Sequence, residues 1–290
     1  MKKLSLVILI TLFCNTLHAQ NDSIDVKQDV VIYSFFYNMV PDRFNFPLIG
    51  FVNLAMGNHQ GLQVGFVNTN FKNFSGAQIG FVNTVMQEVT GLQVGLVNTT
   101  FSEKTGYQIG LVNTVKKIMK GSQIGLVNYA DTVTGVPIGI VSIVKRGGYK
   151  AVEISTNEYY PINLSFKIGV PKLYSFIQFG YNPDFDRNFA SGFGFGSLAL
   201  IGKNFYFNPE ISLLNSINSK NYSHRFLAFA GNFRYNLNSR FQVAAGPSLV
   251  WEHSGQSGKL FDPVYSIINN KIDDKNRLVI GARAALSFDF

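Results

Sequence analysis

Charged residues, cysteine and tryptophan are scarce in this 290-residue chain. Asp, Glu, Lys and Arg make up 14% of it, against roughly a quarter in ordinary soluble domains, whereas 46% is hydrophobic. A disordered chain has the opposite balance and is excluded. The single cysteine, Cys14, excludes a disulfide-bonded scaffold. After Cys14, no stretch reaches the roughly 18 consecutive apolar residues that a membrane-spanning helix requires.

The start of the chain resembles a secretory leader. Lys2 and Lys3 precede an apolar run at residues 4–13, and polar residues follow Ala19. This order predicts a signal peptide over residues 1–19 that is cleaved near Ala19. Its removal lowers the formal net charge from +8 to +6 and takes away the only thiol. An exported chain without a hydrophobic helix can enter a membrane only as a closed β-barrel.

A repeat of 15 residues fills residues 46–145, after an N-terminal strand or linker at residues 20–45. Its unit is Gly-x-Gln-(Val/Ile)-Gly-(Phe/Leu)-Val-Asn-Thr, followed by about six variable residues that we expect to form an exposed return segment. The repeated amides are Gln63, Gln78, Gln93, Gln108 and Gln123, with Asn53, Asn68, Asn83, Asn98, Asn113 and Asn128. Both ends depart from the consensus, as the caps of a repeat array do.

The repeat unit predicts β-structure, and two arrangements fit it. Apolar side chains alternate with Gln, Gly and Val within residues 91–98, which is the period of a strand. In a parallel β-solenoid each unit is one coil, and like amides stack about 4.8 Å apart as ladders. In a transmembrane meander each unit is one strand with its turn. Identical units suit a translational stack better than strands of alternating direction, so we favour the solenoid over additional barrel strands.

The repeat ends near residue 146, and the aromatic-rich remainder predicts a barrel domain over residues 146–290. About eight strands are expected, at residues 150–157, 162–170, 173–181, 190–201, 204–214, 225–235, 240–251 and 278–290. Apolar positions alternate with small or polar ones, which is typical of a lipid-facing barrel. The charges predicted to face the lumen are Glu153, Lys167, Glu210, Arg234, Arg283 and Asp289. Because side chains just fill an eight-stranded barrel, their pairing would close the lumen.

The connections between these strands alternate in length. Short ones at residues 170–172, 202–203 and 236–239 alternate with longer ones at residues 182–189, 215–224 and 252–277. Outer-membrane barrels combine short periplasmic turns with long outer loops in this way. A soluble antiparallel sandwich is the alternative, but the leader, the long aromatic-rich strands and the terminal Phe290 argue against it.

The repeat block of Gly-x-Gln-(Val/Ile)-Gly-(Leu/Phe)-Val-Asn units resembles the surface-repeat outer-membrane β-barrel proteins of Gram-negative bacteria. The segments at residues 148–155 and 163–169 are similar to the barrel part that follows such repeats. The resemblance covers most of residues 46–290 and implies a location in the outer membrane or at the cell surface. It carries over no catalytic residue and no ligand.

Candidate catalytic and metal sites are weak. His59, His224 and His253 have no metal-ligating neighbour at helical spacing, and Asp184, Asp186 and the pair Asp273-Asp274 lack a complete calcium pattern. Ser223-His224 could be read as the Ser/His pair of a lipid-modifying enzyme. A solvated loop is the simpler reading, because no orienting carboxylate is evident. We therefore predict no catalytic, metal or cofactor-binding residue.

The leading functional hypothesis is a non-enzymatic outer-membrane or surface protein. Its barrel is the anchor, and its repeat module is a structural or binding surface. The expected partners are outer-membrane lipid and also surface polysaccharide or another surface protein, whereas the dispersed positive charge argues against nucleic acid. The alternative is a porin-like transport protein in which the repeats add barrel strands around a pore. A lipid-modifying enzyme ranks third.

Overall fold

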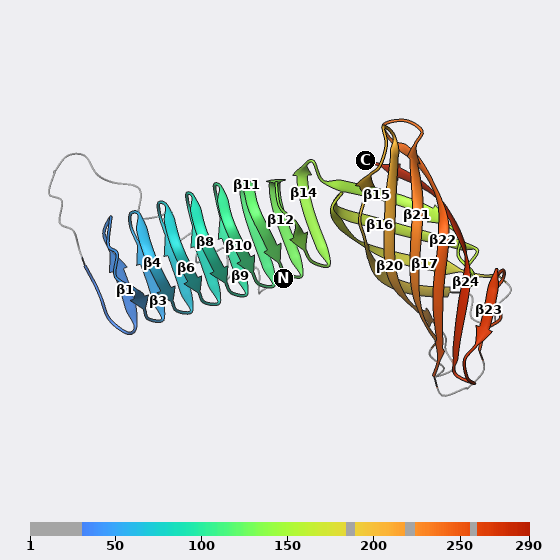
Figure 1. Ribbon diagram of the computed structural model, residues 1–290. Helices are drawn as coiled ribbons and strands as arrows, with labels where there is room; N and C mark the ends of the chain where they lie inside the picture. The colour runs from blue at the N-terminus through green and yellow to red at the C-terminus, as the bar shows by residue number, and fades with distance from the viewer. Residues whose placement is uncertain (1–30, 184–188, 218–223, 256–259) are drawn as a thin grey trace.

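The computed structural model describes residues 31–183, 189–217, 224–255 and 260–290. The expected leader at residues 1–19 lies outside these ranges. The described chain is all β and has two parts, a parallel solenoid followed by a closed antiparallel barrel, which confirms the predicted fold class (Figure 1). In the described ranges, no helix has the length and apolarity needed to cross a membrane.

Each coil of the solenoid contributes two short strands, one to each side of the stack. One side contains β2 (Leu48–Ile49), β4 (His59–Val64), β6 (Phe74–Ile79), β8 (Val89–Val94) and β10 (Lys104–Ile109). The other side contains β1 (Tyr37–Val40), β3 (Val52–Ala55), β5 (Val67–Asn70), β7 (Val82–Val85) and β9 (Val97–Thr100). The final coils contain β11 (Val112–Ile124), β12 (Val127–Val133), β13 (Pro137–Ile138) and β14 (Val141–Arg146).

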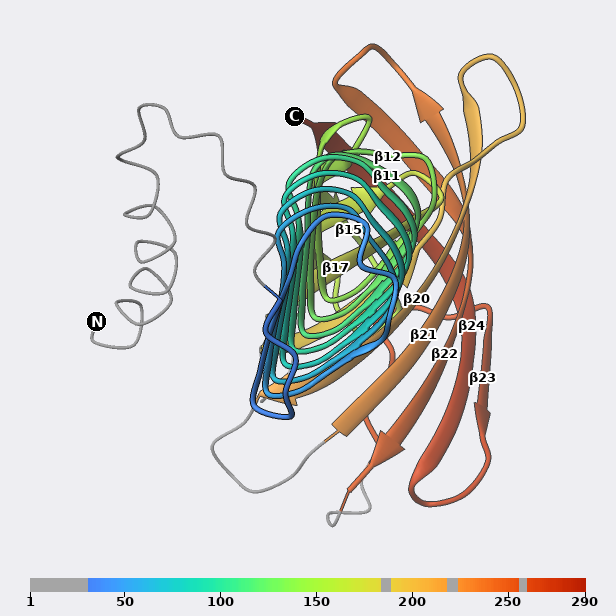
Figure 2. The ribbon, with the colours of Figure 1, turned by 90° about the vertical axis from the view of Figure 1, so that its left-hand side faces the viewer.

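Neighbouring coils pair in parallel at a spacing of one repeat. Gln93 of β8 lies opposite Gln78 of β6 and Gln108 of β10. Figure 2 shows the coils stacked in line when viewed from the N-terminal side. The repeat units are therefore not strands of the barrel. The stack also begins one coil earlier than residue 46, because β1 pairs with β3 and places Asn38 opposite Asn53.

Two rows of glycine make this close stacking possible. Gly91 has a φ of 125°, and a Cβ there would lie 2.0 Å from the carbonyl oxygen of Gly76. A Cβ on Gly95 would lie 2.3 Å from the carbonyl oxygen of Gly80 and 2.7 Å from Nδ2 of Asn83. The first row needs a backbone conformation that other residues rarely adopt, and the second needs space for the asparagine side chains. Both explain why the repeat keeps its glycines.

The variable segment of the repeat is not simply an exposed return, so that expectation was wrong. Its first and fifth positions point into the coil, where Val85 and Val89 of one segment pack with Phe74 of the preceding segment. Val115 and Met119 take the same places two coils later. Each variable segment places two side chains inside the coil, which are apolar in one case (Val85 and Val89) and polar in another (Thr100 and Lys104).

The barrel contains eight long antiparallel strands. They are β15 (Tyr149–Ser155), β16 (Ile162–Val170), β17 (Leu173–Tyr181), β18 (Phe189–Gly196), β20 (Phe205–Ile217), β21 (His224–Asn236), β22 (Phe241–Ser254) and β24 (Asn276–Asp289). Pairing of β15 with β24 closes the cylinder. Two short strands, β19 (Ala199–Leu200) and β23 (Ile268–Lys271), add to β20 and β24. All eight predicted strands are present.

The two ends of the barrel differ. β15 begins and β24 finishes at the end where residues 171–172, 197–204 and 237–240 connect neighbouring strands. We call this the short-turn end. The connections at residues 182–188, 218–223 and 255–275, parts of which lie outside the described ranges, join strands at the opposite end, which we call the long-loop end. The 255–275 connection is by far the longest. The short connection expected at residues 202–203 was wrong, because β18 stops at Gly196 and the connection at 197–204 contains β19.

The solenoid meets the barrel at the short-turn end. β14 leads into β15 through Gly147 and Gly148, close to where the C-terminus lies (Figure 1). The hydroxyl of Ser175, on the outer wall of β17, donates a hydrogen bond to the carbonyl oxygen of Ile140 at 2.6 Å. Ser175 is only 7% exposed because the last coil covers it. The solenoid therefore rests against the outside of the barrel.

Candidate functional site

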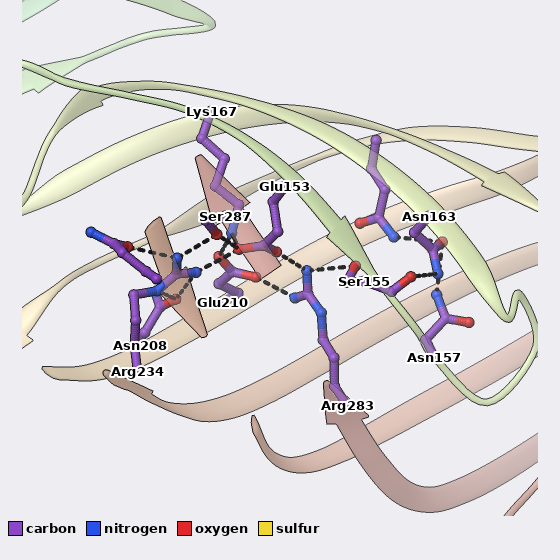
Figure 3. A network of polar contacts seen from close by, with 12 residues as sticks. Glu153, Ser155, Asn157, Asn163, Lys167, Asn208, Glu210, Arg234, Arg283 and Ser287 are labelled. Atoms are coloured by element: carbon purple, nitrogen blue, oxygen red, sulfur yellow. Dashed lines mark hydrogen bonds and ion pairs between the residues drawn. The ribbon is translucent and has the colours of Figure 1, made fainter. Parts of the chain in front are cut away.

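Five of the six charges predicted for the lumen form one buried ion-pair network (Figure 3). The Lys167 ammonium lies 2.6 Å from the Glu153 carboxylate and 2.5 Å from that of Glu210. The Arg283 guanidinium contacts the same two carboxylates, at 2.6 Å from Glu153. Arg234 approaches from the other side and lies 2.6 Å from Glu153. Strands far apart in sequence are thereby joined across the lumen.

Neutral side chains complete this layer. Asn208, Gln242 and Ser287 accept hydrogen bonds from Arg234, and the Tyr174 hydroxyl donates one to Glu210. Asp289, the sixth predicted charge, accepts a hydrogen bond from Gln242 at 2.6 Å and is joined to the network only through that amide. A buried charge is costly unless it is paired and hydrogen-bonded, and the five buried ions meet this condition.

The lumen is filled. Tyr159 and Tyr160, from the connection between β15 and β16, are buried against Phe226 at the long-loop end. The cavity between them and the ion-pair layer, beside Glu158 and Ser212, has a volume of about 20 Å³. This is space for about one water molecule. The predicted closed lumen is thus what the described residues form.

His224 is not in a solvated loop, so the expectation for this residue was wrong. It begins β21, is 1% exposed and stacks on Phe261 with ring centroids 4.0 Å apart. Its Nδ1 lies 3.3 Å from the Glu252 carboxylate, which also accepts hydrogen bonds from Tyr159 and from the backbone N–H of Phe261. The pair fastens the 255–275 connection to the barrel. Ser223, its proposed partner, lies outside the described residues.

In the part of the chain that the structure describes, no cluster of three or more His, Cys, Asp or Glu side chains could hold a metal ion. Asp273 accepts hydrogen bonds from Asn276 and the backbone of Lys275, and Asp274 pairs with Lys271, so both aspartates hold a turn. Asp184 and Asp186 lie outside the described residues.

The repeated amides form two continuous ladders inside the solenoid. Each Asn Nδ2 from Asn38 to Asn113 donates to the Oδ1 of the next Asn at 2.7 to 2.9 Å. Each Gln Nε2 from Gln78 to Gln123 donates to the Oε1 of the preceding Gln at similar distances. The amide dipoles of the two ladders therefore run in opposite directions along the stack. All the predicted ladder residues take part.

Lys104 is a buried charge that the sequence analysis missed. It occupies the inward row of Phe74, Val89 and Met119, and its ammonium donates to the carbonyl oxygens of Gly91 and Thr105. Burial lowers the pKa of Lys104 to about 7. Burial also lowers the pKa of His59, in the same row. The signal was available, because position 104 falls at the 15-residue spacing of Val89 and Met119.

The exterior of the solenoid is amphipathic. Between its two strands each coil turns at a Gly followed by Phe, Leu or Ile, and these side chains form a continuous row that we call the apolar ridge. Its members are Phe51, Phe66, Phe81, Leu96, Leu111, Leu126 and Ile140. A groove of about 690 Å³ follows the ridge. Its floor contains Gly65, Gly80 and Gly95, which lie between the ridge and a parallel row formed by Val64, Ile79, Val94 and Ile109.

Charged residues avoid the ridge completely within residues 31–147. They lie in the variable segments or near the ends of the strands that flank them, at the opposite corner of the coils, as Asp42, Arg43, Lys72, Glu88, Glu103, Lys104, Lys116, Lys117, Lys120, Asp131, Lys145 and Arg146. The solenoid thus buries amide ladders beside its apolar core and presents aliphatic and aromatic side chains along one outer edge. Large exposed apolar patches of this kind mark interaction surfaces.

No protein-family model, curated protein or solved structure matches this chain. Two features of the molecule bear on its function: the filled and charged lumen of the barrel and the apolar ridge of the solenoid.

Proposed function

We propose that this chain is a non-enzymatic outer-membrane protein of a Gram-negative bacterium, exported through the leader at residues 1–19. The barrel is its anchor, and the repeat module is a rigid structural or binding surface. The observation that carries this proposal is the separation of side chains across the barrel wall. The charged network lies inside, between buried aromatic clusters, and nearly all charged side chains of the wall avoid its outer face. The outward positions are large and apolar, including Phe166, Ile177, Phe179, Phe193, Phe229, Phe233, Leu249 and Trp251.

An aqueous environment does not account for large apolar side chains on the outside of the barrel and charges on its inside, whereas a lipid bilayer does. A soluble barrel would keep its apolar side chains inside and its charges outside. Outer-membrane barrels do the opposite, with an apolar outer band around a polar interior. The tight turns at residues 171–172 and 237–240 lie at one end and the longest loop, at residues 255–275, lies at the other, which supports the same proposal because outer-membrane barrels have short turns at one end and long loops at the other.

The porin-like alternative loses its structural premise. It needed the repeats as additional barrel strands around a wider lumen, but the repeats form a separate parallel stack. The lumen of the eight-stranded barrel is crossed by the ion-pair network and by Tyr159 and Tyr160. These features favour an anchor over a channel.

The position of the module bears on its partners. It leaves the barrel at the short-turn end, which faces the periplasm in outer-membrane barrels. Lipid and periplasmic molecules are then better candidate partners than the surface polysaccharide or surface protein that the sequence suggested.

A folding experiment tests the anchor. The full chain, diluted from urea into phosphatidylcholine vesicles, should form a barrel that migrates faster on gels before heating than after. Phe229→Arg, on the outer wall, should reduce the folded fraction, because a cation near the bilayer midplane costs about 2–4 kcal/mol. Phe101→Arg, at the charged corner of the solenoid, is the matched control and should fold like the wild type. Equal folding of all three proteins in buffer without lipid would refute the proposal.

A further inference from the structure

We infer that the apolar ridge of the solenoid lies in lipid, so that the repeat module is seated along the same leaflet that meets the short-turn end of the barrel. This inference rests on the proposed function, because it requires that the barrel is embedded. It assigns the ridge an occupant, the acyl chains of the bilayer.

The first argument is continuity between the ridge and the outer wall of the barrel. Ile140, the last member of the ridge, lies in a single apolar pocket with Phe166, Ile168 and Ile177 of the wall. The hydrogen bond from Ser175 to Ile140 fixes this junction. Lipid that covers Phe166 and Ile177 is therefore already in contact with the end of the ridge.

The second argument is the direction in which the ridge faces. β14 runs from Val141, beside the ridge, to Arg146, and the chain then begins β15 at the barrel rim. In the last coil, the corner that carries Ile140 of the ridge is thus farther from the short-turn end of the barrel than the opposite corner, which carries Lys145 and Arg146. The ridge points toward the middle of the apolar wall, and the charged corner points toward the water beyond the short-turn end.

The third argument is the uniformity of the ridge. Each coil presents the same kind of side chain at the same place, with Leu96 48% and Leu111 48% exposed. Seven such coils at about 4.8 Å spacing make a straight apolar strip roughly 30 Å long. A specific protein partner would need polar groups or local differences for recognition, whereas a bilayer accepts any uncharged apolar edge.

Fluorescence quenching in vesicles tests the inference. Because Cys14 lies in the expected leader, each introduced cysteine is the only thiol of the processed chain. We would attach an environment-sensitive fluorophore to Leu96→Cys on the ridge, to Gln87→Cys at the charged corner and to Phe229→Cys on the barrel wall. The processed chain, residues 20–290, is folded into phosphatidylcholine vesicles, with spin-labelled lipid or aqueous iodide as quencher.

The expected result is that spin-labelled lipid quenches the label at position 96 severalfold more than the label at position 87, and that iodide shows the reverse order. Position 229 reports on the barrel. If position 229 is quenched by lipid but position 96 only by iodide, the inference fails and the proposed function stands. If neither is quenched by lipid, the proposed function fails as well.

Two further outcomes are distinguishable. A label at position 96 that neither quencher reaches would show a protein partner or a second copy on the ridge and would overturn the inference. Leu111→Cys, one coil away, repeats the measurement and guards against a local effect of one substitution. The gel-mobility shift confirms that each labelled protein is folded.

Discussion

At the scale of single residues, the solenoid depends on polar groups that are buried but paired. Asn98 donates to Asn113 and to the carbonyl oxygen of Ile109, and accepts from Asn83. Each such hydrogen bond contributes about 1 kcal/mol, whereas an orphaned partner costs about 1–3 kcal/mol. The ladders therefore make the coil register strict, because a slipped coil would leave several amides unpaired at once.

Lys104 is the exception, and it makes the stability of the module depend on pH. Its pKa is about 7 in the folded protein against 10.5 for an ordinary lysine, so the unfolded chain binds more protons between these values. Stability should rise from pH 7 to pH 10, by at most about 1.4 kcal/mol per pH unit. Below pH 7 the full cost of the buried charge is present.

Lys104→Met, which matches the neighbouring Met119, should remove this dependence and stabilise the module at pH 7. Hydrogen exchange of residues 89–124, corrected for the pH dependence of intrinsic exchange, would measure both effects. Lys117→Met, at an exposed position of the next coil, is the control and should leave the dependence intact. A flat pH profile in the wild type would contradict the assignment.

At the scale of elements, the coil is the unit of stability, since it contacts only its neighbours. Deletion of residues 76–90 removes one full repeat and brings Gln63 opposite Gln93. We expect this variant to keep its β-structure with a modest loss of stability. Deletion of residues 76–82 removes about half a coil, disrupts both ladders and should unfold the module. Circular dichroism and limited proteolysis of the membrane-embedded chain would separate the two outcomes.

The sequence also predicted the positions of single strands better than it predicted contacts between distant residues. Residues 162–170 and 173–181 form strands with the predicted bounds, because alternation and the Pro171 turn define them locally. The contact of His224 with Glu252 could not be predicted, since it depends on strand register and on a connection that folds back. The buried first and fifth positions of the variable segments were missed because their identity changes from coil to coil, from Val85 and Val89 to Thr100 and Lys104.

At the scale of the whole molecule, the charged side chains in the lumen should block the barrel, so that solute ions do not pass through it. The full chain inserted into a planar bilayer should show no conductance above that of the protein-free membrane. Tyr159→Ala combined with Tyr160→Ala removes the rings at the long-loop end and should still not conduct, because the ion-pair layer remains. A stable unitary current from the wild type would contradict the closed lumen and revive the transport hypothesis.

The groups at the two ends of the amide ladders limit the number of coils in the solenoid. At the first coil, the backbone N–H of Ser34 donates to Asn38 Oδ1 at 2.7 Å, and at the last coil Asn128 donates to the Ser142 hydroxyl. Pro137 stands where the next glutamine would be. Terminated in this way, an amide-rich parallel stack of the type that elongates without limit in amyloid becomes a finite object, whose asparagine ladder ends on groups of the same chain.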